Sequence, residues 1–101
     1  MIKASIPYKP TLLEGLKDPK EAAEYLNAAL EEKEPELFLL ALRNVAEAHG
    51  IKKLAEDTHL NRESMYRMLS EQGNPQLSSL TSILKEMGLR LAIEVEETIS
   101  A

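Results

Sequence analysis

The chain has 101 residues, of which 44% are hydrophobic and 29% charged, a composition typical of one small globular domain. It contains no cysteine, which excludes disulfides, thiol catalysis and cysteine-ligated metals. No apolar stretch is long enough for a transmembrane helix, and residues 1–8 lack the apolar region of a signal peptide. We therefore expect a cytoplasmic protein.

The net charge of −5 is unevenly distributed along the sequence. Residues 1–36 hold five basic and eight acidic side chains, whereas residues 51–76 hold four of each. An acidic surplus taken alone argues against nucleic acid and favours a basic partner. The surplus lies at the two ends of the chain, however, and the middle is balanced.

The first ten residues are predicted to form an arm. Residues 2–6 alternate between apolar and polar side chains, which is a weak strand pattern. Pro7 and Pro10 disfavour a helix at this place. Thr11 then caps a short helical turn over residues 12–16.

A stronger helix start follows at Asp18. Asp18 can cap the helix, Pro19 suits its first position, and Glu21 can reach back to the amide of the cap. We expect this helix to run to about Glu32.

Four further helices are predicted over residues 35–49, 51–58, 62–70 and 77–87, because each has apolar residues at helical spacing. Gly50 and Gly88 are plausible stops, and Asn61 caps the third of these helices. The side chains expected to face inward are Leu37, Phe38, Ala41, Leu42, Val45, Ala48, Ile51, Leu54, Ala55, Met65, Met68, Leu69, Leu77, Leu80, Ile83, Leu84 and Met87.

The last predicted element is a half-buried β-strand, because its apolar residues recur with a period of two. These residues are Leu89, Leu91, Ile93 and Val95. A strand needs a partner, since a bare apolar edge invites aggregation. The partner is either residues 2–6 of the same chain, in a monomer, or the same strand of a second subunit. We favour the homodimer, with this strand or the last helix in the interface.

The helices at 51–58 and 62–70 are separated by only a few residues, which predicts a helix-turn-helix. Ala55 is small enough to let the second helix approach the first. Leu60 fills the turn, and Met65 and Met68 fill the space between the helices.

Several blocks of the sequence resemble one family. Residues 54–66 resemble the helix-turn-helix of the lambda-repressor-like (XRE) class. Residues 61–70, the Gly73-Asn74-Pro75 turn, residues 87–91 and the leader at 17–30 are similar to the addiction-module antidote proteins. These are the HigA-type antitoxins, which are encoded beside small basic toxins. The likeness covers about residues 12–95.

The resemblance implies a fold and a division of the chain. We expect an all-α, lambda-repressor-like helix-turn-helix bundle with a short C-terminal β-strand and an N-terminal arm. Residues 1–34 would form the arm and first helix, and residues 35–101 the DNA-binding domain with the strand, in one compact unit. His59 departs from the class, which usually has glycine at this turn because the backbone there prefers a positive φ. Histidine tolerates that conformation better than most residues, so we expect a small cost in stability.

The second helix of the motif carries the residues expected to read DNA bases. Glu63 and Arg67 lie opposite the inward-facing residues, and Arg62 lies in the first turn. Arginine can bond a guanine edge twice, and glutamate can accept from cytosine N4. In the resembled class these three positions are the usual base contacts. The alternative is that they form an ordinary solvated helix face.

Contacts to the DNA backbone are expected from polar side chains and from the amides near Ile51. The residues proposed for these contacts are Lys52, Lys53, Ser64, Tyr66, Gly73 and Asn74.

The resemblance also implies the function. The chain would be the antitoxin of a type II toxin–antitoxin module, which represses its own promoter and neutralises a small basic RelE/ParE-like toxin. Such toxins are commonly ribosome-dependent ribonucleases. The acidic first helix would bind the toxin through Glu21, Glu24, Glu31 and Glu32. The alternative is that these acids form an ordinary solvated face. Two alternatives remain, a stand-alone regulator without a toxin and an interaction module that does not bind DNA.

We expect no enzyme. His49 and His59 are the only histidines, and no His/Asp/Glu cluster has metal-ligand spacing. Ser64 has no base at a persuasive spacing, and there is no glycine-rich phosphate loop. The sequence therefore predicts no catalytic residue, no metal site and no cofactor.

Overall fold

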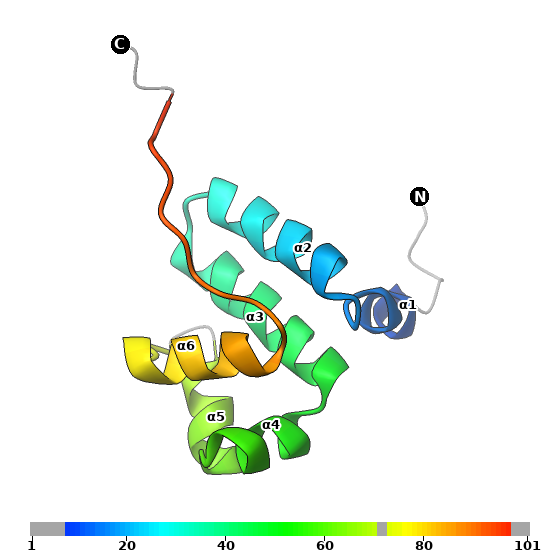
Figure 1. The fold of residues 1–101 in the computed structure, drawn as a ribbon. Coiled ribbons are helices and arrows are strands. Elements are labelled where there is room, and N and C mark those ends of the chain that lie inside the picture. The colour runs from blue at the N-terminus through cyan, green and yellow to red at the C-terminus, as the bar shows by residue number, and fades with distance from the viewer. Residues whose placement is uncertain (1–7, 71–72, 98–101) are drawn as a thin grey trace.

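The computed structural model describes residues 8–70 and 73–97, and all regular secondary structure in these ranges is helical (Figure 1). Helices α2 and α3 form an antiparallel pair, α4 follows at the end of α3, and α5 and α6 both pack against α4 (Figure 1). The elements in chain order are α1 (Tyr8–Gly15), α2 (Pro19–Glu31), α3 (Pro35–His49), α4 (Ile51–Thr58), α5 (Arg62–Met68) and α6 (Leu77–Glu86).

Capping residues set the starts of α2 and α5, as expected. The Asp18 carboxylate accepts a hydrogen bond from the Lys20 amide at 3.0 Å, and Pro19 occupies the first helical position. The Asn61 side chain accepts from the Ser64 amide at 3.0 Å. The prediction that the Glu21 side chain would accept a hydrogen bond from the Asp18 amide is wrong, because the Asp18 amide donates to the Gly15 carbonyl instead.

The expected N-terminal arm is partly wrong, because α1 begins at Tyr8 rather than near residue 12. Pro10 lies in the first turn of α1, where backbone amides have no acceptor within the helix, so a proline costs little there. The strand considered for residues 2–6 lies outside the described residues.

The expected C-terminal strand is not seen in the single chain. Residues 89–97 have no regular secondary structure, and no strand is found elsewhere in the described ranges. Leu89 packs against the core, but Leu91, Ile93 and Val95 are 44%, 96% and 85% exposed. A β-ladder needs amide and carbonyl groups from a second strand. The alternation of apolar residues in the sequence indicates only which side chains would lie on the same face of a strand.

One hydrophobic cluster joins the helices, and its centre is where α3, α4, α5 and α6 meet. Leu42, Leu54, Met65 and Ile83 are completely inaccessible to solvent. Helix α4 contacts α3, α5 and α6, so it holds the second half of the chain together. Leu37 and Leu77 were expected to face inward, but they are 37% and 67% exposed and lie outside the cluster, each near the start of its helix.

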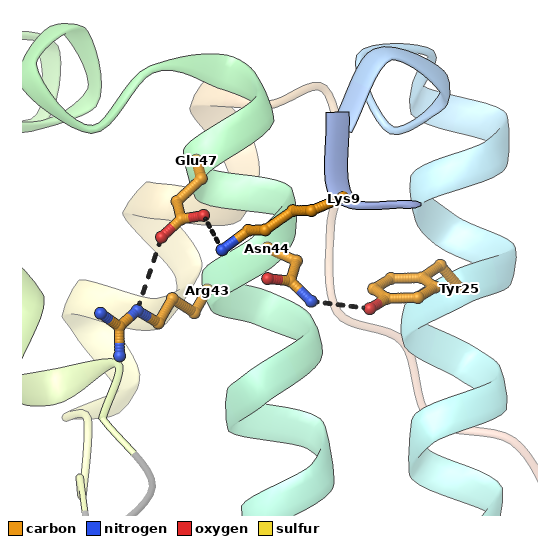
Figure 2. A network of polar contacts seen from close by, with 5 residues as sticks. All are labelled: Lys9, Tyr25, Arg43, Asn44 and Glu47. Carbon is orange, nitrogen blue, oxygen red and sulfur yellow. Dashed lines mark hydrogen bonds and ion pairs between the residues drawn. The ribbon is translucent and has the colours of Figure 1, made fainter. Parts of the chain in front are cut away.

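Polar contacts tie α1 and α2 to α3 (Figure 2). The Asn44 amide donates a hydrogen bond of 2.9 Å to the Tyr25 hydroxyl, in a part-buried position between α2 and α3. Lys9 of α1 lies 2.9 Å from Glu47, which also pairs with Arg43 at 3.6 Å. Exposed ion pairs stabilise little, about 0–1 kcal/mol, so these contacts mainly orient the helices.

The connection from α4 to α5 depends on a left-handed residue. His59 has φ 61° and ψ 28°, which confirms the positive φ expected at this position. The turn lets the Leu60 amide donate to the Ala55 carbonyl at 3.0 Å, which closes the end of α4. Leu60 and Met68 pack against the core, and Ala55 and Met65 are buried, as expected.

Replacing His59 with glycine should stabilise the protein, because glycine adopts the left-handed conformation without strain. Relief of the strain raises the free energy of unfolding, and the larger entropy that glycine loses on folding lowers it. The net gain is up to about 1 kcal/mol. Thermal unfolding of His59→Gly should show a melting temperature higher by a few degrees. The control Glu56→Gly, on an exposed helical position of α4, should lose about 1 kcal/mol. Destabilisation by both changes would contradict this account of the turn.

Candidate functional site

Helix α5 is anchored on one side and exposed on the other. Met65 and Leu69 are buried at 0% and 1% exposure, which fixes the direction that α5 turns toward the core. Glu63 and Arg67 lie roughly opposite Met65 at about 100° per residue, and both are exposed. Arg62 and Tyr66 are exposed as well. The structure therefore places the three predicted base-reading residues on the outer surface of α5.

The charged side chains of α5 are exposed. In the described part of the chain, no salt bridge involves Arg62, Glu63 or Arg67. A ligand that contacts them would not have to break any of the salt bridges described.

A groove of about 660 Å³ runs between α5 and the beginning of α6. It brings together four of the predicted site residues, two from α5 and two from the following turn. Among its described lining residues, only Arg67 is charged. The lining consists of Leu60, Ser64, Arg67, Met68, Ser70, Gly73, Asn74, Pro75, Gln76 and Ser79.

Gly73 lets the chain pass close to the end of α5. A Cβ at this position would collide with the Met68 carbonyl group, so no other residue fits without a backbone shift. The Gly73 amide donates to the Ser70 carbonyl at 2.8 Å. The close approach brings Asn74 to the same groove as Arg67.

The two predicted lysines lie outside the groove lining. Lys52 and Lys53 are exposed on α4, and the Lys53 ammonium lies 3.3 Å from Asp57, one turn later in the same helix. Gly50 precedes α4 with φ 111° and provides no side-chain cap. The first amides of α4 therefore have no side-chain acceptor from the capping residue.

Sequence reasoning missed two polar residues of the groove, Gln76 and Ser79. It places Ser70 on the same side of the second helix as Glu63 and Arg67. The Ser70 hydroxyl donates to the Arg67 carbonyl at 2.8 Å. Gln76 is the N-cap residue of α6 and has an extended backbone, but its side chain makes no capping hydrogen bond. Ser79 lies in the first turn of α6. The signal in the sequence was Gln76, a polar residue directly after the Asn74-Pro75 turn, with Ser79 in the first turn of the helix that follows.

The four acidic residues proposed for a toxin are exposed and share one side of α2. At 100° per residue they fall within an arc of about 100°. Glu21 and Glu24 line a hollow between α1 and α2, and Glu31 and Glu32 lie at the other end of the helix. The two pairs are separated by roughly 15 Å along the axis. No salt bridge involves any of them within the described ranges.

Residues 8–70 and 73–97 contain no group of three or more His, Asp or Glu side chains placed to hold a metal ion. None of their helices combines the length and apolar character needed to cross a membrane.

Comparison with known proteins identifies the family. Residues 10–95 match the family described as "Probable addiction module antidote protein". A protein of Haemophilus influenzae (strain ATCC 51907 / DSM 11121 / KW20 / Rd), described as "Uncharacterized protein", is 33% identical over 81 residues, covering 80% of this chain and 84% of that protein. No solved structure matches. Because the match extends over most of the chain, the protein belongs to the addiction module antidote family.

Proposed function

We propose that this protein is the antitoxin of a type II toxin–antitoxin pair, of the HigA type, which binds its own operator and neutralises its toxin by direct contact. Membership of an antidote family implies a toxin partner in general. We further propose that the toxin is a small basic RelE/ParE-like protein and that the antitoxin is a homodimer. The antitoxin would be cytoplasmic and would act by binding and not by catalysis.

The observation that carries the DNA-binding part is the outer surface of α5. Helices α4 and α5 are joined by residues 59–61, and this short connection with its left-handed His59 supports the proposal of a helix-turn-helix of the XRE class. In such motifs the second helix enters the major groove and its first turns meet the base edges. Exposed Arg62, Glu63 and Arg67 supply the donors and the acceptor that base edges require.

The groove beside α5 supports backbone contacts. DNA phosphates accept hydrogen bonds from hydroxyl and amide groups, and the groove presents Ser64 and Asn74. Among its described lining residues the one charged side chain is the basic Arg67, which favours an anion at this place in a chain of net charge −5.

The acidic side of α2 supports the toxin part. Four exposed carboxylates would attract a basic protein and speed its association. Helices α2 and α5 lie at opposite ends of the helical body (Figure 1). The toxin and the operator could therefore be bound at the same time.

Removing the α5 arginines should weaken operator binding. Arg62→Ala and Arg67→Ala should each cost about 1–3 kcal/mol if the arginine bonds a guanine in two places. Fluorescence anisotropy with labelled duplex from upstream of the gene measures this loss. Lys20→Ala removes the same charge from exposed α2 and should change affinity little. Unchanged affinity and selectivity in both arginine variants would favour an interaction module that does not bind DNA.

Neutralising the α2 acids should slow toxin binding. The variant Glu21→Gln/Glu24→Gln/Glu31→Gln/Glu32→Gln should lower the association rate with the neighbouring gene's product by about tenfold or more at low salt. Surface plasmon resonance measures the rate.

A matched comparison separates a local effect from net charge. The double variants Glu21→Gln/Glu24→Gln and Glu31→Gln/Glu32→Gln remove two charges each, as does the control Glu56→Gln/Glu86→Gln on α4 and α6. If both α2 pairs behave like the control, the toxin binds elsewhere.

A further inference from the structure

The C-terminal segment 89–97 leaves large apolar side chains in solvent. It passes in front of α3 and then extends away from the helices (Figure 1). Ile93 and Val95 are 96% and 85% exposed, the highest values among the large hydrophobic residues that the structure describes. Adjacent exposed apolar side chains of this kind mark an interaction surface.

The two ends of this segment have different surroundings. Leu89 and Leu91 line a hollow with Leu26 and Leu30 of α2, Phe38 of α3 and Leu84 of α6. Leu89 is half-buried there and packs against the core. Ile93 and Val95 lie farther along the segment and are outside this lining. The segment therefore begins as part of the core and ends without apolar cover from the described residues.

We propose that a second copy of the chain covers this segment, by antiparallel pairing of the two 89–97 segments about a two-fold axis at Ala92. This inference rests on the homodimer of the proposed function, but it requires neither DNA nor a toxin. In a two-fold pair the same surface serves both copies, so each segment would cover the other.

The alternation of side chains limits the register. In antiparallel strands, directly opposed residues point to the same side of the sheet. A shift by one residue would place the apolar side chains opposite the polar ones. The axis must therefore pass through a residue, such as Ala92, Ile93 or Glu94, and not between two residues.

Side-chain chemistry then favours Ala92. With the axis there, Leu89 opposes Val95 of the second copy and Leu91 opposes Ile93 of the second copy. Arg90 opposes Glu94 of the second copy, so the two-fold gives two such pairs of opposite charge. All the apolar residues of the segment are matched.

The neighbouring registers are poorer. An axis at Ile93 places Leu89 opposite Glu97 and Ala92 opposite Glu94, which mixes apolar and charged residues. An axis at Glu94 places the two copies of that carboxylate directly opposite each other, and like charges in that position repel.

The same register also accounts for the exposed ends. Because Val95 and Ile93 of the second copy stand beside Leu89 and Leu91, they would lie next to the hollow between α2 and α6. Each copy would thus supply the apolar cover that the other copy lacks.

Single cysteines test the register, because the chain has none of its own. Opposed residues in antiparallel strands have Cβ atoms about 4.5–5.5 Å apart, close to the roughly 3.8 Å of a disulfide. Under mild oxidation, Ala92→Cys should form a disulfide dimer on a non-reducing gel at least several times faster than Ile93→Cys. Ser82→Cys, exposed on α6, is the control. Faster cross-linking of Ile93→Cys, or equal rates for Ala92→Cys and Ser82→Cys, would overturn the register.

Sedimentation of the unmodified chain and of Ile93→Glu/Val95→Glu tests the interface itself. Both side chains are exposed in the single chain, so circular dichroism should show unchanged helix content while the dimer dissociation constant rises at least tenfold. A wild-type monomer, or a dimer that tolerates both glutamates, would overturn the inference. DNA binding by the same samples is scored separately, so loss of this interface is distinguishable from failure of the proposed DNA-reading role.

Discussion

The orientation of α5 depends on the short turn that joins it to α4. Helix α4 ends at His59, which has the left-handed conformation. The Asn61 side chain caps α5 by accepting a hydrogen bond from the Ser64 amide. Burial of Leu54 and Met65 then locks the two helices together. Because α5 is only 7 residues long, this turn and one buried methionine decide which side chains face outward. The exposed arginines and the groove beside them follow from that constraint.

The uneven distribution of charge would allow an acidic protein to bind DNA through α5, as proposed. The excess acids lie on α2 and near the C-terminus, whereas the described lining of the α5–α6 groove has Arg67 as its only charge. Long-range repulsion from the acids would still act on DNA, and it is screened beyond about 10 Å at moderate salt. Few phosphate contacts are available, so affinity would depend more on base contacts than in strongly basic proteins.

The sequence predicted the helices well where local signals define their ends. The bounds 35–49 and 51–58 are confirmed, because Pro35 and Gly50 act locally through their backbone conformations. The strand at Leu89 is not seen in the single chain because a strand is defined by a partner, which no local pattern supplies. The groove residues Gln76 and Ser79 were missed because their position depends on how the start of α6 approaches the end of α5.

The central claim is that α5 reads a specific DNA sequence. The most direct measurement is a titration of the protein against labelled duplex from immediately upstream of its gene, at several salt concentrations, with a scrambled duplex as control. The account predicts selective binding of the upstream duplex, with a shallower salt dependence than very basic DNA-binding proteins show. Equal weak binding of both duplexes, or none, would contradict the operator-reading role.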